Sequence, residues 1–196
     1  MRQSSSAYRR ATKTDHDGVR LWSIEHESPL RIFAGHLADV DAVSFHCNTN
    51  YLATGSADKS VRLWEVQRGP CVRLLLGHTG VVNTVCCSPC GQYIASAGED
   101  KTIVIWDIPT GKPARVLRGH TSSIWSVDYS ACGKILSSGS ADGTVKIWDS
   151  DLTKAEPAES LLTSHDALQG AKAGRNTLTI TNVAFTRRNL LLAAAI

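Results

Sequence analysis

A repeat of 42 residues constrains this chain more than any other feature of its sequence. A Gly-His pair occurs three times, a Trp follows each of these His residues by 28 positions, and an Asp lies six positions before each Trp. The three sets are Gly35-His36, Asp58 and Trp64; Gly77-His78, Asp100 and Trp106; Gly119-His120, Asp142 and Trp148. A fixed period of about 40 to 45 residues is typical of a β-propeller, in which each unit supplies one four-stranded blade.

Short runs of β-branched and aromatic residues between the markers predict the strands of these blades. For one complete unit we expect strands at 40–45, 51–54, 61–64 and 72–75. Trp22 lies 42 positions before Trp64, so two late strands precede the first complete unit, and two early strands, at 178–185 and 190–195, follow the third. The sequence therefore predicts an all-β fold, a partial propeller of about four blade equivalents.

The composition fits a globular chain without a strong charge signal. Hydrophobic residues make up 42% of the sequence and the net charge is +3, so no basic stripe predicts direct nucleic-acid binding. The longest apolar runs fall well short of the ~20 residues that a membrane span needs, so we expect no membrane contact. The six cysteines follow no secretory leader, which favours reduced thiols in an intracellular protein.

The two ends of the array differ from its centre. Residues 1–17 form a polar, Ser-rich segment that we interpret as an N-terminal tail, followed by the partial propeller at 18–196. Within that propeller the markers stop, and 150–174 is a polar stretch that we expect to be a loop. The chain looks like a fragment, and we expect the array to stay an open arc of a seven-bladed ring whose bare edges make the chain self-associate.

The repeated markers resemble those of the WD-repeat family. In that family the His, a Ser or Thr of the second strand, the turn Asp and the Trp form a hydrogen-bonded relay inside one blade. The resemblance assigns the relay to His36, Thr54, Asp58 and Trp64; to His78, Ser96, Asp100 and Trp106; and to His120, Ser138, Asp142 and Trp148. Trp only donates and a carboxylate only accepts, so the four groups suit a buried chain of hydrogen bonds.

The same residues are compatible with two chemical alternatives, a hydrolase triad and a zinc site. His, Ser and Asp together also describe a hydrolase triad, but an active site is needed once and this set occurs three times in register. Cys86, Cys87 and Cys90 form half of a zinc motif without the second pair of ligands that such a site needs. We therefore expect no catalytic residue, no cofactor and no metal site, and hence a protein that is not an enzyme.

Three segments carry a narrower resemblance. The stretches 30–40 (LRIFAGHLADV), 51–58 (YLATGSAD) and 185–194 (FTRRNLLLAA) are similar to the WD-repeat region of the TFIID subunit 5 family. That resemblance implies a nuclear scaffold for RNA polymerase II initiation, with the histone-fold subunits of TFIID as partners and a related role in SAGA-type coactivators in some lineages. A generic WD-repeat adaptor in another nuclear or cytoplasmic complex remains the alternative.

Positions that change character inside the fixed repeat are candidates for a protein-binding surface. The residue five after each marker His is Asp41, Asn83 or Trp125, and the residue before the second turn Asp is Glu99. An exposed Trp is a strong candidate for a binding anchor. We interpret Asp41, Asn83, Glu99 and Trp125 as the candidate contact residues.

Overall fold

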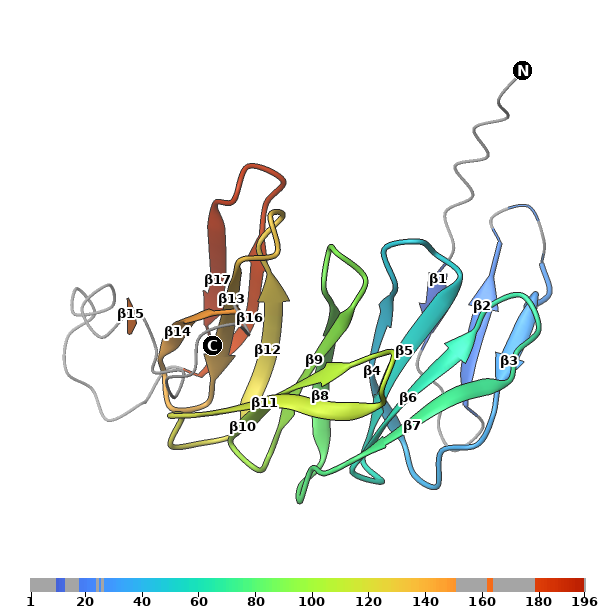
Figure 1. The fold of residues 1–196 in the computed structure, drawn as a ribbon, viewed down its shortest axis with the longest axis horizontal. Helices are drawn as coiled ribbons and strands as arrows, with labels where there is room; N and C mark the ends of the chain where they lie inside the picture. Colours follow the sequence, from blue (N-terminus) through green and yellow to red (C-terminus); the bar gives the residue numbers. More distant parts are fainter. Residues whose placement is uncertain are drawn as a thin grey trace.

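The computed structural model describes residues 10–12, 18–23, 25, 27–150, 162–163 and 179–195. In these ranges the chain forms five antiparallel sheets (Figure 1). The first sheet has three strands, β1 (Arg10–Thr12), β2 (Val19–Trp22) and β3 (Arg31–Phe33). The last has two, β16 (Ile180–Phe185) and β17 (Leu191–Ala195).

Three complete four-stranded sheets lie between these end sheets, and each pairs its strands in simple succession. The first contains β4 (Val40–Phe45), β5 (Tyr51–Ser56), β6 (Ser60–Glu65) and β7 (Cys71–Leu76). The second contains β8 (Val82–Cys87), β9 (Tyr93–Gly98), β10 (Thr102–Asp107) and β11 (Lys112–Arg118). The third contains β12 (Ile124–Tyr129), β13 (Ile135–Ser140), β14 (Val145–Asp149) and β15 (Leu162–Thr163).

The sheets follow one another as the blades of an open arc. Their first strands, β4, β8, β12 and β16, contact one another in order, while the β1–β3 and β16–β17 sheets lie at opposite ends of the molecule (Figure 1). No pairing joins these two end sheets in the described residues. The prediction of an all-β, partial propeller is confirmed, and the ring is not closed.

The apolar core is divided into layers, each shared by two neighbouring sheets. One layer joins the first complete blade to the second, and it contains Leu63 and Leu75 of one with Ile94 and Trp106 of the other. These four side chains are 2% exposed or less. Because each face of a blade is buried only by its neighbour, a single blade has no complete core of its own.

The N-terminal segment differs from the predicted tail. Within residues 1–17 the structure has β1, which pairs with β2 in the register Ala11 to Leu21 and Thr12 to Arg20. Ala11 and Thr12 stand 42 positions before Ala53 and Thr54 of β5, so the segment follows the same repeat. The sequence analysis did not predict β1, because the segment is polar and Ser-rich and only two small residues, Ala11 and Thr12, carry the match to the repeat.

The predicted loop at 150–174 also contains a strand. β15, at Leu162–Thr163, pairs with β14 and completes the third blade. The period of 42 residues would put this fourth strand near 156–159, so the strand comes later in the chain than the repeat predicts. Most of the predicted loop and tail lies outside the described residues.

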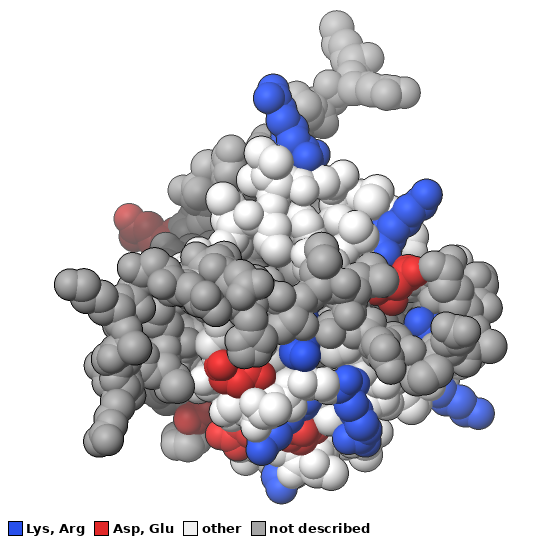
Figure 2. Space-filling view, turned by 90° about the vertical axis from the view of Figure 1, so that its left-hand side faces the viewer, with Lys and Arg blue, Asp and Glu red and all other residues white. Residues whose placement is uncertain are grey.

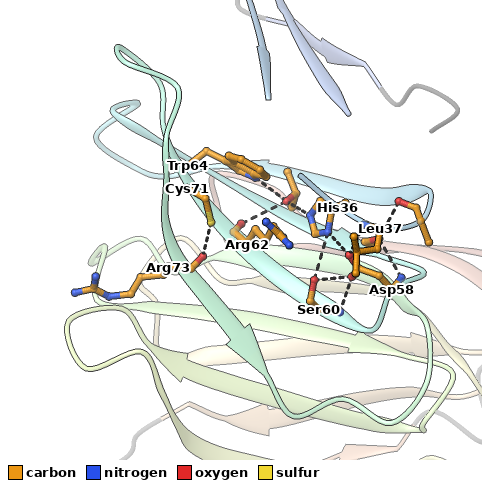
Figure 3. Close-up of polar contacts among 11 residues, drawn as sticks. His36, Leu37, Asp58, Ser60, Arg62, Trp64, Cys71 and Arg73 are labelled. Atoms are coloured by element: carbon orange, nitrogen blue, oxygen red, sulfur yellow. Dashed lines mark hydrogen bonds and ion pairs between the residues drawn. The ribbon is translucent and has the colours of Figure 1, made fainter. Parts of the chain in front are cut away.

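Arginines on two of the fourth strands, β3 and β7, link their blade to the next one. Arg31 of β3 donates from Nη1 to the carbonyl of Arg68 at 3.1 Å, in the turn after β6. Arg73 of β7 repeats the contact one blade later, donating to the carbonyls of Ile108 at 3.4 Å and Pro109 at 3.2 Å. In Figure 3 Arg73 extends away from the other labelled side chains.

We expect Arg73→Ala to lower the thermal unfolding midpoint by about 2 to 4 °C, because bonds between two blades are lost at a cost of about 1 kcal/mol. Arg118→Ala is the matched control, since Arg118 is exposed on the neighbouring fourth strand, β11. Differential scanning calorimetry measures both. Equal midpoints for the two variants would contradict a role of Arg73 in joining the blades.

Candidate functional site

A buried hydroxyl on the second strand of each complete blade holds the repeated polar site together. In the middle blade Ser96 Oγ lies 2.7 Å from His78 Nε2 and 2.7 Å from Trp106 Nε1. The other ring nitrogen of His78 lies 2.7 Å from Asp100 Oδ2. One chain of hydrogen bonds therefore joins three strands or loops of the same blade.

The direction of each bond follows from what the groups can donate. A carboxylate only accepts, so His78 Nδ1 carries the proton and donates to Asp100. Nε2 of the neutral ring then accepts from the Ser96 hydroxyl, which in turn accepts the Trp106 N–H. Every polar group of the chain is paired in this arrangement, as buried groups require.

The same contacts recur in the two flanking blades. The His Nδ1 to Asp Oδ2 distance is 2.9 Å for His36 and Asp58 and for His120 and Asp142. Figure 3 shows the first of these blades, with His36 directed at Asp58 and Trp64 on the opposite side of the network. The remaining distances are 2.7 Å for His36 to Thr54, 2.9 Å for Trp64 to Thr54, 2.7 Å for His120 to Ser138 and 2.8 Å for Trp148 to Ser138.

The glycine of each Gly-His pair leaves room for the Trp ring of its blade. A Cβ at Gly77 would come 3.0 Å from Trp106 Cη2, and one at Gly119 would come 3.1 Å from Trp148 Cη2. Such contacts are shorter than carbon atoms normally make. The Gly-His and Trp markers are therefore two halves of one packing arrangement.

Burial and hydrogen bonding shift the acid–base equilibria of the site. Burial lowers the pKa of His36 and His120 below the ordinary value, although the bond to the partner carboxylate partly offsets this. Burial alone would raise the pKa of Asp100 and Asp142, but the donors around each carboxylate outweigh it and lower the pKa to about 2. The pKa of Asp58 is lowered as well. For His36 and His120, neutral imidazole beside a carboxylate is thus the stable state.

Sequence reasoning missed a further member of the network. The residue two after each turn Asp is a Ser or Thr whose hydroxyl donates to the second carboxylate oxygen, Oδ1. The distances are 2.5 Å for Ser60 to Asp58, 3.0 Å for Thr102 to Asp100 and 2.6 Å for Thr144 to Asp142. These hydroxyls keep the 42-residue step, so the signal was present in the sequence.

Backbone N–H groups complete the coordination of each Asp. The N–H of the residue after the marker His donates to Oδ2, over 2.9 Å from Leu37, 3.1 Å from Thr79 and 2.9 Å from Thr121. Any residue except proline can supply a backbone N–H, so these donors do not require a particular side chain. Leu37 occupies the position that Thr79 and Thr121 have in the other two blades. No sequence pattern could have identified these contacts.

The connectivity matches that of a hydrolase triad, but the burial is wrong for catalysis. Thr54, Ser96 and Ser138 are each 0% exposed, so no substrate carbonyl can reach the hydroxyl oxygen. Each hydroxyl also accepts a Trp N–H, which holds its lone pair away from nucleophilic attack. The arrangement stabilises a blade and has no route to acyl transfer.

The relay does not extend into the last sheet. β17 pairs with β16 so that Ala193 lies opposite Val183, as Thr54 lies opposite Val43 in the first complete blade. Ala193 therefore stands at the hydroxyl position and offers no hydrogen-bonding group. This substitution agrees with the loss of the Gly-His and Trp markers after residue 149.

The cysteines do not gather into a metal centre in the described part of the chain, where no group of three or more His, Cys, Asp or Glu side chains is placed to bind an ion. Burial raises the pKa of the Cys86 and Cys87 thiols to about 12, which keeps both protonated. Cys90 is exposed in the turn after β8. No helix in the described part of the chain is long and apolar enough to cross a membrane.

Three of the four candidate contact residues share a structural feature that the sequence did not reveal. Asp41, Asn83 and Trp125 are each the extra residue of a β-bulge, on β4, β8 and β12 respectively. A bulge turns its side chain away from the regular alternation of the strand. This explains why residue character changes at these positions, while the residue before each of them (Val40, Val82 and Ile124) stays apolar.

The bulge residues differ in how free their side chains are. Asn83 donates from Nδ2 to the carbonyl of Ile124 at 3.0 Å, so it connects β8 to the next blade. Asp41 is half-buried, whereas Trp125 is 45% exposed, and Glu99 is exposed in the turn between β9 and β10. Trp125 and Glu99 are thus the more accessible candidates for contact with a partner.

The fold and the repeated network define a WD-repeat protein. The family described as WD domain, G-beta repeat, matches residues 27–65, 69–107 and 111–149, which together exceed half of the chain. The chain therefore belongs to the WD-repeat family. WD repeats mediate protein–protein interactions, and proteins of this family are generally non-catalytic scaffolds.

One known protein is similar to a segment of this chain. A segment of 55 residues is 40% identical to transcription initiation factor TFIID subunit 5 of Caenorhabditis elegans. The aligned segment covers 28% of this chain and 8% of the nematode protein, so the chain corresponds to a small part of that relative.

We expect Asp100→Ala to lower the thermal midpoint by about 5 to 10 °C. The substitution removes the acceptor for His78, Thr79 and Thr102, and leaving buried donors without a partner costs about 3 kcal/mol. Glu99→Ala is the control, because Glu99 is exposed one residue away. A loss of the same size in both variants, measured by calorimetry, would refute the role of the relay.

Acidification should destabilise the chain in two stages. His36 and His120 have lowered pKa values in the folded state, so the unfolded chain binds more protons as the pH falls below about 6.5. The stabilisation from Asp100 and Asp142 is present above about pH 3.9 and is lost as the pH falls towards their folded pKa of about 2. Calorimetry from neutral to acidic pH tests this, and a constant midpoint across that range would contradict it.

Proposed function

We propose that this chain is a protein-interaction scaffold that works in the nucleus as a WD-repeat component of the general transcription factor TFIID. The observation that supports this most directly is the 40% identity over 55 residues to TFIID subunit 5 of C. elegans. The three WD matches support the scaffold role. Membership of a SAGA-type coactivator is a related proposal.

The turn between β16 and β17 lies in the FTRRNL segment, one of those that resemble the TFIID subunit 5 family. Thr186 and Asn189 shape this turn: Asn189 N–H donates to the Thr186 carbonyl at 2.9 Å, and Asn189 Oδ1 accepts the Ala131 N–H of the preceding blade at 2.9 Å. Arg187 and Arg188 between them are exposed. Part of the FTRRNL segment thus has a structural role, and its two arginines are available to a partner.

The partners that we propose are protein subunits, among them the histone-fold subunits of TFIID. Trp125 is the candidate anchor because large aromatic side chains dominate the energetics of protein interfaces. Its position on a bulge at the start of β12 puts the ring outside the regular packing of the strand. Asp41, Asn83 and Glu99 complete the proposed contact set.

Affinity purification of the tagged chain from nuclear extract, followed by mass spectrometry, tests this function. We expect TFIID subunits in the eluate, and we expect Trp125→Ala to reduce their recovery through a loss of about 2 kcal/mol of binding free energy. Val116→Ala is the matched control, because Val116 is a hydrophobic residue with nearly the same exposure as Trp125, 43% against 45%.

Three results would overturn parts of this proposal. Recovery of SAGA subunits without TFIID would assign the chain to the coactivator. Recovery of an unrelated complex would favour a generic WD-repeat adaptor. Undiminished recovery with Trp125→Ala would move the binding surface away from the bulges.

A further inference from the structure

The guanidinium of Arg62 has no partner of opposite charge in the described part of the chain. Its Nε is buried without a hydrogen-bond acceptor, and none of the ion pairs among the described residues includes Arg62. Its Cζ lies over the Trp64 ring, 5.8 Å from the ring centre (Figure 3). A charged group that is partly withdrawn from water and left without an acceptor is costly to the fold.

The carboxylates near Arg62 along its own blade are engaged with other groups. Asp58 accepts hydrogen bonds from His36, from the N–H of Leu37 and from the Ser60 hydroxyl. Glu65, on the same strand as Arg62, lies 3.9 Å from the Nε of Arg68. The guanidinium of Arg62 is therefore available to an acceptor from outside the described chain.

The packing of a blade does not require a guanidinium at this position. The residue one repeat later is Val104, which is 4% exposed, so an apolar side chain satisfies the same packing. Gly35 leaves the guanidinium uncovered on one side, since a Cβ there would come 3.0 Å from Arg62 Nη1. The charge and its opening to the surface are features of the first complete blade that its packing does not explain.

Two exposed leucines lie beside Arg62 on the same face of the blade. β7 pairs with β6 so that Leu74 is opposite Arg62 and Leu76 is opposite Ser60, and directly opposed residues share a face. Leu74 is 48% exposed and Leu76 is 66% exposed. The one charged residue of β7 is Arg73, which donates to carbonyls of the next blade. A single cation with apolar neighbours thus lies on the third and fourth strands of this blade.

The charge and the apolar area together indicate the kind of partner. At the end of the arc that carries β16 and β17, Lys and Arg lie among Asp and Glu, so that surface has no charge of one sign to offer (Figure 2). One positive charge beside two leucines is instead complementary to one carboxylate flanked by large apolar side chains. Nucleic acid needs several cations to neutralise successive phosphates, and this site supplies one.

We propose that Arg62, Leu74 and Leu76 form a docking site for a segment of a partner protein in which an Asp or Glu lies between large apolar residues. The guanidinium pairs with the carboxylate through the planar, two-point geometry that these groups share. Leu74 and Leu76 cover the apolar neighbours of that carboxylate. The site is separate from the bulge residues, which lie on the first strands, and it does not depend on membership of TFIID.

Selection of short random peptides, displayed on phage, against the purified full chain tests the proposal. We expect the enriched peptides to carry an Asp or Glu beside Leu, Ile or Phe. Arg62→Gln should weaken the binding of these peptides about tenfold, because charge-assisted hydrogen bonds are lost. Leu74→Lys should also weaken it, because this variant puts a charge on the apolar part of the site.

The other two complete blades supply matched controls. Lys146→Gln removes a charge at the repeat position of Arg62, and Val116→Lys adds one at the repeat position of Leu74. Val116 is 43% exposed, so its substitution disturbs the packing as little as that of Leu74 does. Both controls should bind the peptides as the native chain does.

An exchange of the two charges tests whether the contact is direct. Arg62→Glu should lose the acidic peptide and should bind a copy in which Lys replaces the acidic residue. A change in fold would weaken both peptides, so this reversal requires that residue 62 contacts the charged side chain of the peptide.

The proposal is overturned if no peptide is enriched, if the enriched peptides lack acidic residues, or if Arg62→Gln and Lys146→Gln weaken binding equally. It is also overturned if Arg62→Glu does not bind the Lys peptide. Circular dichroism checks that each variant keeps its strands, and the variants should fold because Leu74 is exposed and Arg62 is half-buried. The peptides are synthetic, so their failure to bind leaves the proposed membership of TFIID untouched.

Discussion

The hydroxyl on the second strand of each blade is the group on which the rest of the structure depends. Ser96 accepts the Trp106 N–H and donates to His78, and His78 donates to Asp100. These bonds tie the second and third strands to the loop that arrives from the preceding blade. Since Ser96 is 0% exposed, water cannot replace any partner that is lost, and the network is satisfied only when the whole blade is assembled.

Cohesion between blades has a different physical origin. Neighbouring sheets share the apolar layers, so a face of a blade is excluded from water only while the neighbouring blade packs against it. Arg31 and Arg73 add hydrogen bonds across the outer rim, from one blade to the turn of the next. In the described part of the chain no further blade packs on the β16–β17 sheet, and Leu192 is 61% exposed.

Much of the fold was predictable because the repeat fixes residue type at positions where only one type fits. The Gly-His pairs, turn Asp and Trp identified three units, and alternation of apolar residues gave most strands. β1 was missed because it is short and lies in a polar segment, and β15 because it falls outside the 42-residue step. The bulges at Asp41, Asn83 and Trp125 follow from how two strands fit together, which no single strand records.

The sequence by itself determined the family, the blade unit and the members of the relay, because each depends on contacts within one repeat and the repeat is written three times. Only the tertiary structure decided how the blades join, which candidate side chains are accessible and which surfaces stay uncovered. Those properties depend on contacts between repeats, where residues at equivalent positions of the repeat contact different neighbours. β17 illustrates the difference, since a strand with the composition of a buried element is exposed where no third strand of the described residues pairs with it.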